Sequence, residues 1–345
     1  MEFQVGQETR LTSFARKSAK TAGADRAIDA VSRIISGHSP DVAFRLGPDL
    51  STDALAVDFD LGRLMQAHRT RWRCCELADL PAPIHCLVME AGSHESYLQI
   101  RYDLAVAAQR LTADGQLLLL VRDRKLAPRL GKFAEEWFGE VDRRPDKVSW
   151  IRCTRPRRGI PEPPYGPPVA CTDPVSSRSY ALATWPGLFS GEALDIGTAL
   201  LLEHIPPVEG RDVLDVGCGY GPISVVAAGR GGRVTYADTD MRALRLTAEN
   251  LATAGLAGSS LLTSDLSGLS PQSFDAVFSN PPTHAGSATL KTLFERMIKA
   301  CRPGGDVRIV LRQHLNYEKW LDRLARVETI ALRDGYKVLR ISAAD

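Results

Sequence analysis

The chain has 345 residues, of which 44% are hydrophobic and 24% are charged, and its formal net charge is only +2. This composition excludes a disordered chain, and no apolar run approaches the roughly 20 residues that a membrane span requires. Because the length exceeds that of most single domains, we expect two domains in a soluble, cytoplasmic, monomeric protein without an export signal.

The seven cysteines form neither a C-x-x-C pair nor a spacing that suits zinc, so we expect free thiols and no metal site. The adjacent Cys74 and Cys75 could form a redox pair, but two buried small side chains are the preferred interpretation. The small net charge neither requires nor excludes a nucleic acid partner, which a local basic patch would decide.

The first half of the chain alternates strands and helices in the manner of a doubly wound sheet. Residues 9–35 are helix-prone, and strand-like runs follow at 42–46, 55–59 and 84–89, with turn residues between them. No glycine-rich turn accompanies these strands, so this half lacks the usual means of binding a nucleotide.

Basic residues of the first half gather in clusters near Trp72 and Trp150. Guanidinium groups close to aromatic rings suit RNA phosphates and exposed bases. Acidic residues lie between the clusters, so each one taken singly is better explained as solvated surface, yet we expect at least one to contact RNA. The clusters are Arg69, Arg71 and Arg73; Arg122, Arg124, Lys125 and Arg129; Arg143, Arg144 and Lys147; and Arg152, Arg155, Arg157 and Arg158.

Six prolines between residues 159 and 174 exclude a helix or a central strand, and we interpret this segment as a linker. A hairpin arm is expected at 179–184, followed by Trp185. A helix at 196–205 then leads to the next strand.

Residues 213–221, Val-Leu-Asp-Val-Gly-Cys-Gly-Tyr-Gly, join a short apolar strand to three alternating glycines. Gly217, Gly219 and Gly221, with Cys218 between the first two, let the backbone turn sharply and approach a ligand closely. Pro222 begins a helix that runs to about residue 228, and the free N–H groups of its first turn face the ligand.

The residues around this turn favour S-adenosylmethionine (SAM) over a dinucleotide. The dinucleotide fingerprint needs glycine where this chain has Pro222, which argues against NAD and FAD. Asp215 precedes the turn and suits the methionine amino group, while Asp238 ends the next strand, 233–237, and suits the ribose hydroxyls. The alternative is a loop glycine cluster with two incidental aspartates.

The rest of the chain continues the alternation and contains an internal repeat. Residues 104–123 and 294–313 both read as a helix, a tight glycine turn, a buried strand and an arginine, which suggests a duplicated domain whose first copy lost the cofactor turn. None of Gly217, Gly219, Gly221 and Asp238 has a counterpart before the linker. We expect helices at 241–253, 288–301 and 317–325, strands at 261–264, 276–279 and 307–311, and an antiparallel pair at 327–332 and 336–341.

Several motifs carry a resemblance to a known family over about residues 185–341. They are the glycine turn, Asp238, Ser264-Asp265, Phe274-Asp275, Ser279-Asn280-Pro281-Pro282, Phe189-Ser190 and Leu194-Asp195-Ile196-Gly197. This part of the chain resembles class I SAM-dependent methyltransferases of the "methyltransferase small" type, and within them the bacterial ribosomal RNA guanine-N2 methyltransferases.

The resemblance implies an α/β fold with two tandem Rossmann-like methyltransferase domains. Residues 1–158 would form a degenerate first domain that serves RNA binding and support. Residues 159–174 would form the linker, and residues 175–345 a catalytic domain with a seven-stranded class I methyltransferase sheet.

The resemblance also assigns roles to site residues. The Asn280 side-chain oxygen and the Pro281 carbonyl would accept the two N–H bonds of the target amine, with Pro282 completing the motif, and this alignment would aim the nitrogen lone pair at the methyl group. Asp265 would lie near the adenine amine, although a helix-cap role suits it equally well.

One position departs from the family pattern. Relatives carry Phe or Tyr after the second proline, where the ring stacks on the target base, and this chain has Thr283. Trp185 and Phe189 are the candidates to replace that ring. Further candidate substrate contacts are His284, Arg312 and His314.

The leading hypothesis is therefore methylation of guanine N2 in ribosomal RNA or the small ribosomal subunit. A second hypothesis is methylation of a glutamine amide in release factors, whose methyltransferases share Asn-Pro-Pro but carry an aromatic at the position of Thr283. A third is a non-catalytic RNA-binding assembly factor that keeps SAM for stability. A small-molecule acceptor also remains open.

Overall fold

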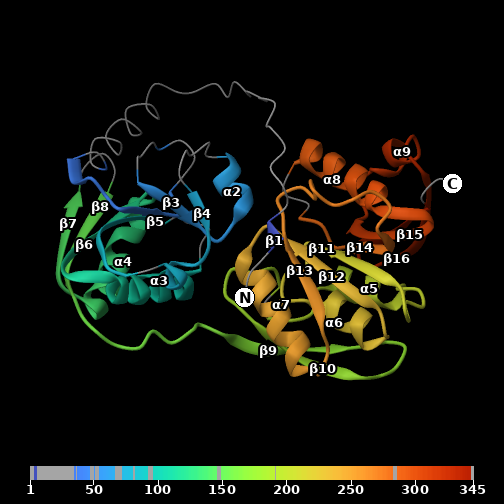
Figure 1. The fold of residues 1–345 in the computed structure, drawn as a ribbon, viewed down its shortest axis with the longest axis horizontal. Helices are drawn as coiled ribbons and strands as arrows, with labels where there is room; N and C mark the ends of the chain where they lie inside the picture. Colours follow the sequence, from blue (N-terminus) through green and yellow to red (C-terminus); the bar gives the residue numbers. More distant parts are fainter. Residues whose placement is uncertain are drawn as a thin grey trace. The chain divides into compact units, whose positions relative to one another are not determined.

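The computed structural model of the chain describes residues 4–5, 35, 37–46, 50, 54–66, 72–80, 82–91, 96–145, 149–190, 192–282 and 286–342. The chain divides into two units, of which one is Leu11–Pro164 and the other combines Met1–Arg10 with Tyr165–Asp345. Each unit is built around its own large sheet (Figure 1). Within the described ranges, no helix is long and apolar enough to cross a membrane.

The N-terminal unit has a seven-stranded sheet in the order β4-β3-β2-β5-β6-β8-β7. The first five strands run parallel, and β8 and β7 close one edge as an antiparallel pair. The strands are β2 Val42–Phe44, β3 Leu55–Asp58, β4 Trp72–Cys74, β5 Ile84–Ala91, β6 Leu111–Val121, β7 Phe138–Pro145 and β8 Ser149–Pro156. The helices are α2 Leu61–Gln66, η1 Leu77–Asp79, α3 Tyr97–Arg110, η2 Arg124–Leu126 and α4 Ala127–Trp137.

The strands predicted at 42–46, 55–59 and 84–89 are confirmed as β2, β3 and β5. Strands β7 and β8 were not predicted, because their charged residues were interpreted only as basic clusters. In β8 the buried Ile151 and Cys153 alternate with the exposed Arg152, which is the pattern of a strand with one solvated face. Apart from Ile35, the helices expected at 9–35 lie outside the described residues.

The C-terminal unit has an eight-stranded sheet in the order β1-β13-β12-β11-β14-β15-β17-β16. The predicted seven-stranded sheet is confirmed, and β1 adds an eighth strand at the edge beside β13. The strands are β1 Gln4–Val5, β11 Asp212–Val216, β12 Arg233–Asp238, β13 Gly258–Leu262, β14 Phe274–Ser279, β15 Cys301–Arg312, β16 Arg326–Arg333 and β17 Tyr336–Ser342. The helices are α5 Ile196–Glu203, α6 Pro222–Gly229, α7 Met241–Thr253, α8 Ser287–Ala300 and α9 Glu318–Leu321.

The two sheets repeat one topology, with the third, second, first, fourth, fifth, seventh and sixth strands of each unit as neighbours in that order. They also share an irregularity of register. In one sheet Ile84 pairs with Leu111 and Cys86 with Gln116, and in the other Phe274 pairs with Cys301 and Ala276 with Asp306. The helix-turn-strand repeat in the sequence is therefore a structural repeat, in which α3 and β6 correspond to α8 and β15. The tandem Rossmann-like fold is confirmed.

The linker is shorter than predicted. Gly166–Thr172 form β9, which pairs antiparallel with β10, Ser179–Thr184, as a two-stranded arm (Figure 1). Consecutive residues of a strand direct their N–H groups to opposite edges, so only one of prolines 167 and 168 faces the unpaired edge. The register of β9 and β10 shifts between Leu182 and Thr184, opposite these prolines, which accommodates the other one. Residues 157–165 remain without regular structure.

Candidate active site

The candidate site of the C-terminal unit lies at the carboxyl ends of β11, β12 and β14. Strand order reverses between β11 and β14, and ligands of doubly wound sheets bind at such a switch point. The glycine turn follows β11, Asp238 ends β12, and Asn280 follows β14 directly. The inner strands carry apolar residues because both sheet faces are covered; Leu214 and Val277, for example, are fully buried.

The glycine turn has the backbone conformation that the sequence predicts. Gly217, Gly219 and Gly221 have φ values of 72°, 59° and 86°, a region that other residues adopt only with strain. The N–H groups of Gly217 and Cys218 donate to the Ala237 carbonyl over 2.8 and 3.1 Å. At Gly221 a Cβ atom would lie 2.8 Å from the side chain of Thr247, so this glycine also lets α7 pack against the turn.

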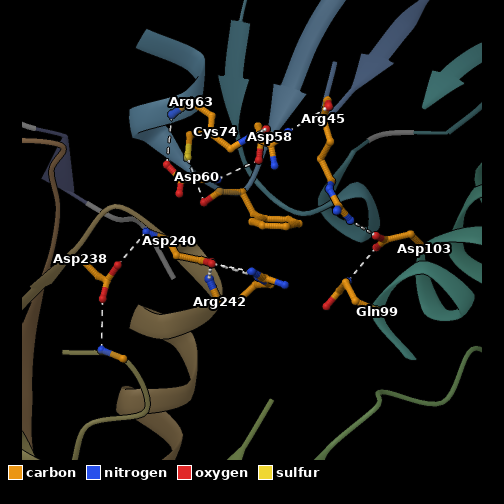
Figure 2. Close-up of polar contacts among 12 residues, drawn as sticks. Arg45, Asp58, Asp60, Arg63, Cys74, Gln99, Asp103, Asp238, Asp240 and Arg242 are labelled. Atoms are coloured by element: carbon orange, nitrogen blue, oxygen red, sulfur yellow. Dashed lines mark hydrogen bonds and ion pairs between the residues drawn. The ribbon is translucent and has the colours of Figure 1, made fainter. Parts of the chain in front are cut away.

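Asp238 is held directly beside this turn (Figure 2). Its Oδ2 accepts the N–H of Gly219 at 3.1 Å, and its Oδ1 accepts the N–H of Asp240 at 3.0 Å. Asp240 caps α7 through the N–H of Arg242 at 2.8 Å. These contacts fix a carboxylate at the strand end, where it suits a pair of ribose hydroxyls.

Asp215 is fully buried beneath the turn. Its Oδ2 accepts the hydroxyl of Ser224 at 2.6 Å, whereas its Oδ1 has no hydrogen-bond partner within the described part of the chain. Burial, with a smaller contribution from the charge of Asp238, raises the pKa of Asp215 to about 7, despite the hydrogen bond from Ser224. A buried acceptor in this state fits a ligand that brings an ammonium group.

Asn280 directs its amide nitrogen to the start of α5. Its Nδ2 donates to Asp195 Oδ2 and to Thr198 Oγ1, each at 2.9 Å. An amide nitrogen has two hydrogens, so both are used, and the side-chain oxygen stays available as an acceptor. Pro281 is buried and Pro282 is exposed. The sequence interpretation missed Asp195, Thr198 and Tyr336 as site residues, although Leu194-Asp195-Ile196-Gly197 was a usable signal.

The other predicted site residues differ in whether the structure describes them and in what they contact. Thr283 and His284 lie outside the described residues. Asp265 lies in a turn, where burial raises its pKa but hydrogen bonds from Ser267 and Arg296 outweigh that effect and hold the pKa below its usual value. Arg312 stacks over the Tyr336 ring at 4.2 Å, and His314 is exposed after β15.

The two aromatic candidates for base stacking differ in exposure. Trp185 is only 8% exposed and packs edge-on against Tyr165, with 5.2 Å between ring centroids. Phe189 is 60% exposed in the loop before α5. Phe189 is therefore the better candidate to contact a substrate base.

The corresponding position in the N-terminal unit is filled by a side chain. Arg45 donates its N–H to the Val57 carbonyl at 2.8 Å, as Gly217 does to Ala237, and has a φ of 57°. Its guanidinium is 2% exposed, bonds Asp103 at 2.6 Å and lies 5.0 Å from the centroid of the Phe59 ring (Figure 2). The residue at the position of Gly217 thus belongs to a buried ion pair in the N-terminal unit.

The expectation that Asp238 has no counterpart in the first half is wrong. Asp58 ends β3 as Asp238 ends β12, and its Oδ1 accepts the N–H of Asp60 at 3.0 Å, the contact that Asp240 makes with Asp238 (Figure 2). Burial raises the pKa of Asp58 to about 6, although Arg63 beside it lowers that value. Strand pairing reveals this correspondence, because Val57 and Ala237 have the same register against β2 and β11.

The predicted basic clusters differ in how their charges are used. Arg143, Arg144 and Arg155 are paired with Glu135, Asp142 and Glu140. Arg158 donates to backbone carbonyls, including that of Ala108. Arg69, Arg71 and Lys147 lie outside the described residues.

Two residues of the second predicted cluster, together with Lys132, expose their charges to solvent. Lys125 in η2 and Arg129 and Lys132 on α4 are exposed, and none of them contacts an acidic side chain among the residues that the structure describes. Arg129 lies over the Tyr97 ring at 3.7 Å. We refer to Lys125, Arg129 and Lys132 as the α4 stripe.

All seven cysteines are free, as predicted, and all except the half-buried Cys74 are buried. Over the described ranges, no group of three or more His, Cys, Asp or Glu side chains could hold a metal ion.

Known proteins match the C-terminal half of the chain, which contains the candidate site. Residues 179–340 match the methyltransferase small domain. The chain is 35% identical over 162 residues to ribosomal RNA small subunit methyltransferase C of Stutzerimonas stutzeri, which covers 45% of this chain and 48% of that protein. It is 36% identical over 167 residues to the protein of that name from Salmonella typhi, covering 46% and 48%. The matches thus span about half the length of these relatives.

One solved structure is similar over most of the chain. It is a 16S rRNA methyltransferase of T. Thermophilus in complex with AdoMet and guanosine, with a TM-score of 0.73, 23% identity and coverage of 88% of both chains. At this identity the likeness establishes the fold, including both units.

Proposed function

We propose that the chain is a SAM-dependent methyltransferase acting on guanine N2 of ribosomal RNA, because residues 179–340 match the methyltransferase small domain and the site described above suits that chemistry. The observation that carries the proposal is the Asn280 amide, whose hydrogens are both bound and whose oxygen is left to accept an N–H from a substrate. The curated relatives named above support ribosomal RNA of the small subunit as the substrate class.

SAM fits the residues of the site and, when bound, supplies a methyl group on a positively charged sulfur. Asp238 would accept the ribose hydroxyls, and the buried Oδ1 of Asp215 would accept the ammonium group. The N–H groups of the first turn of α6 and the open glycine turn would receive the rest of the methionine portion. Asp265 and Cys218 are assigned to the wall of this site.

Asn280 and Pro281 would prepare the acceptor nitrogen. The lone pair of an exocyclic amine is delocalised into the ring, so the nitrogen must be re-hybridised and aimed before it reacts. The Asn280 oxygen and the Pro281 carbonyl would each accept one N–H, which fixes the lone pair in line with the methyl group; such alignment is worth several kcal/mol. Phe189 would stack on the base in place of the ring that Thr283 lacks.

The remaining parts of the proposal concern partners and location. We assign residues 175–345 to catalysis and the N-terminal unit to RNA affinity, through the α4 stripe. We propose the small ribosomal subunit or its RNA as the partner, and a monomer that acts in the cytoplasm.

Asn280→Ala tests the proposed function. The variant should lose methyl transfer through kcat and keep wild-type SAM affinity by calorimetry, because the Asn280 oxygen is assigned to the acceptor amine and the Asn280 amide nitrogen bonds Asp195 and Thr198 rather than SAM. The assay supplies labelled SAM with small subunits, naked rRNA or release factor in parallel. Methylation of release factor alone, or RNA methylation by Asn280→Ala at the wild-type rate, would contradict the proposal.

A further inference from the structure

The Asn280 amide is held by one helix terminus. Asp195 is the N-cap of α5, and its Oδ2 accepts the backbone N–H of Thr198 at 2.9 Å. An N-cap requires no more than this one bond. The Asp195 carboxylate nevertheless receives the Asn280 amide on Oδ2 at 2.9 Å and the Tyr336 hydroxyl on Oδ1 at 3.2 Å.

The backbone around Asp195 is fitted to the same contacts. Tyr336 is 7% exposed, and a Cβ atom on Gly197 would lie 2.7 Å from its ring and 2.9 Å from Asp195 Oδ2. Any larger residue at Gly197 would therefore push Tyr336 and Asp195 apart. The glycine of Leu194-Asp195-Ile196-Gly197 is therefore required by packing. Its backbone conformation does not require glycine, because other residues adopt it without strain.

We propose that Asp195, supported by Tyr336 and Thr198, is a positioning residue that fixes the orientation of the Asn280 amide, so that only its oxygen can face an acceptor amine. This inference rests on the proposed function and deepens it. Asp195 acts through Asn280 and is not assigned a contact with the substrate.

The chemistry of the three partners allows one amide orientation. An ionised carboxylate only accepts hydrogen bonds, and the Thr198 hydroxyl lies 3.4 Å from Asp195 Oδ2, to which it gives its hydrogen. The Thr198 oxygen is then left as a second acceptor for Asn280. A flipped amide would turn its oxygen toward Asp195 and point its N–H groups at the acceptor amine, which needs acceptors.

The decisive experiment exchanges the two groups in the full-length chain. In Asn280→Asp two carboxylates meet, so we expect kcat on ribosomal RNA to fall by about a hundredfold or more. Adding Asp195→Asn restores a donor-acceptor pair in reversed order, and kcat should recover at least about tenfold. The Tm of Asn280→Asp should also drop as pH rises above the carboxyl range, and the double variant should remove that pH dependence.

A hydroxyl deletion provides the matched control. Tyr336→Phe removes only the bond to Asp195 and should lower kcat about five- to tenfold with an unchanged KM for RNA. Tyr317→Phe removes a hydroxyl from a ring of the same unit that packs against Phe294, and should leave kcat unchanged.

The outcomes separate this inference from the proposed function. If the wild type methylates rRNA but the double variant turns over no faster than Asn280→Asp, the positioning role is overturned. Coupling in Tm without coupling in kcat would make the contact purely structural and overturn it as well. If the wild type methylates no RNA, the proposed function fails first and the inference falls with it.

Discussion

Single residues at the site show how burial sets chemistry. Asp215 and Asp238 are both carboxylates near the glycine turn, yet Asp238 is held by two N–H groups and Asp215 has one oxygen without a partner among the described residues. The Asn250 side chain, by contrast, connects two backbone segments near the site. Its amide bonds the carbonyls of Ala183 and Tyr220 at 3.0 and 2.8 Å, which ties the β9–β10 arm to the glycine turn.

The buried carboxylate of Asp215 makes the ligand-free protein sensitive to pH. Its folded pKa of about 7 lies above the value of about 3.9 for an unfolded Asp. The free energy of unfolding should therefore fall as pH rises from about 4 to about 7, by an amount on the order of a few kcal/mol, and Asp215→Asn should remove that fall. Denaturant unfolding of both proteins across this range measures the difference.

A ligand that brings an ammonium group to Asp215 would favour the ionised carboxylate and so lower the pKa of Asp215. SAM binding should release a proton near neutral pH, and SAM affinity should weaken below it by up to about tenfold per pH unit. Calorimetry in buffers of different ionisation enthalpy detects the proton. Identical pH profiles of SAM affinity for wild type and Asp215→Asn would contradict the assignment.

At the scale of elements, equivalent strands end in different chemistry. The turns after β2 and β11 share a backbone hydrogen bond and a left-handed residue, but one carries Arg45 and the other Gly217. The helices after β3 and β12 both begin at an aspartate that accepts a backbone N–H, since Asp60 accepts that of Arg63, three residues on, and Asp240 accepts that of Arg242, two residues on. The N-terminal unit thus keeps the backbone contacts that surround Gly217 and Asp238 but has a buried, ion-paired arginine in place of the first glycine.

This difference predicts one SAM site in each chain and a stabilising role for Arg45. Arg45→Ala removes the guanidinium that pairs with the buried Asp103 carboxylate, so the N-terminal unit should lose about 3–5 kcal/mol of stability. Replacing both residues with apolar ones, as in Arg45→Met with Asp103→Leu, should recover most of that loss. Thermal unfolding measures these changes.

An exposed ion pair in the same unit supplies the control. Arg101 pairs with Glu136 at 2.8 Å with both side chains more than 40% exposed, so Arg101→Ala should cost less than about 1 kcal/mol. Equal losses for Arg45→Ala and Arg101→Ala, or two SAM sites by calorimetry, would refute the interpretation.

At the scale of the whole molecule, two copies of one topology have different surfaces. The C-terminal unit contains residues 179–340, which match the methyltransferase small domain, and the proposed chemistry is assigned to it. The N-terminal unit neutralises many of its arginines internally but leaves the α4 stripe open to solvent. A net charge of only +2 hides this local distinction.

Neutralising the α4 stripe should weaken RNA binding without affecting SAM. The triple variant Lys125→Ala, Arg129→Ala and Lys132→Ala should bind small-subunit RNA less tightly and reduce the slope of log K against log salt by about 2 to 3. The control variant Arg143→Ala, Arg144→Ala and Arg155→Ala removes charges that acidic neighbours already offset, and should change the slope much less. Equal effects in the two triple variants would remove the special role of the stripe.

The sequence by itself determined the features that depend on neighbouring residues. The alternating glycines, the apolar strand before them and Pro222 after them specify the turn, because left-handed φ values and a helix start are local properties. The repeat of helix, turn and strand revealed the duplication. The resemblance to a methyltransferase family also followed from short contiguous motifs, and residues 179–340 match the methyltransferase small domain.

Tertiary structure alone decided which distant residues meet. Asp195 and Tyr336 lie 85 and 56 residues from Asn280 in the chain, at the N-cap of α5 and the start of β17, and no local pattern links them. Asp58 was recognised as the counterpart of Asp238 only through strand register. Likewise, the exposure of Phe189 and the burial of Trp185 became known only from the packed arm. Burial, ion pairing and hydrogen-bond direction depend on what surrounds a side chain in space, and that neighbourhood exists only once the sheets and helices have packed.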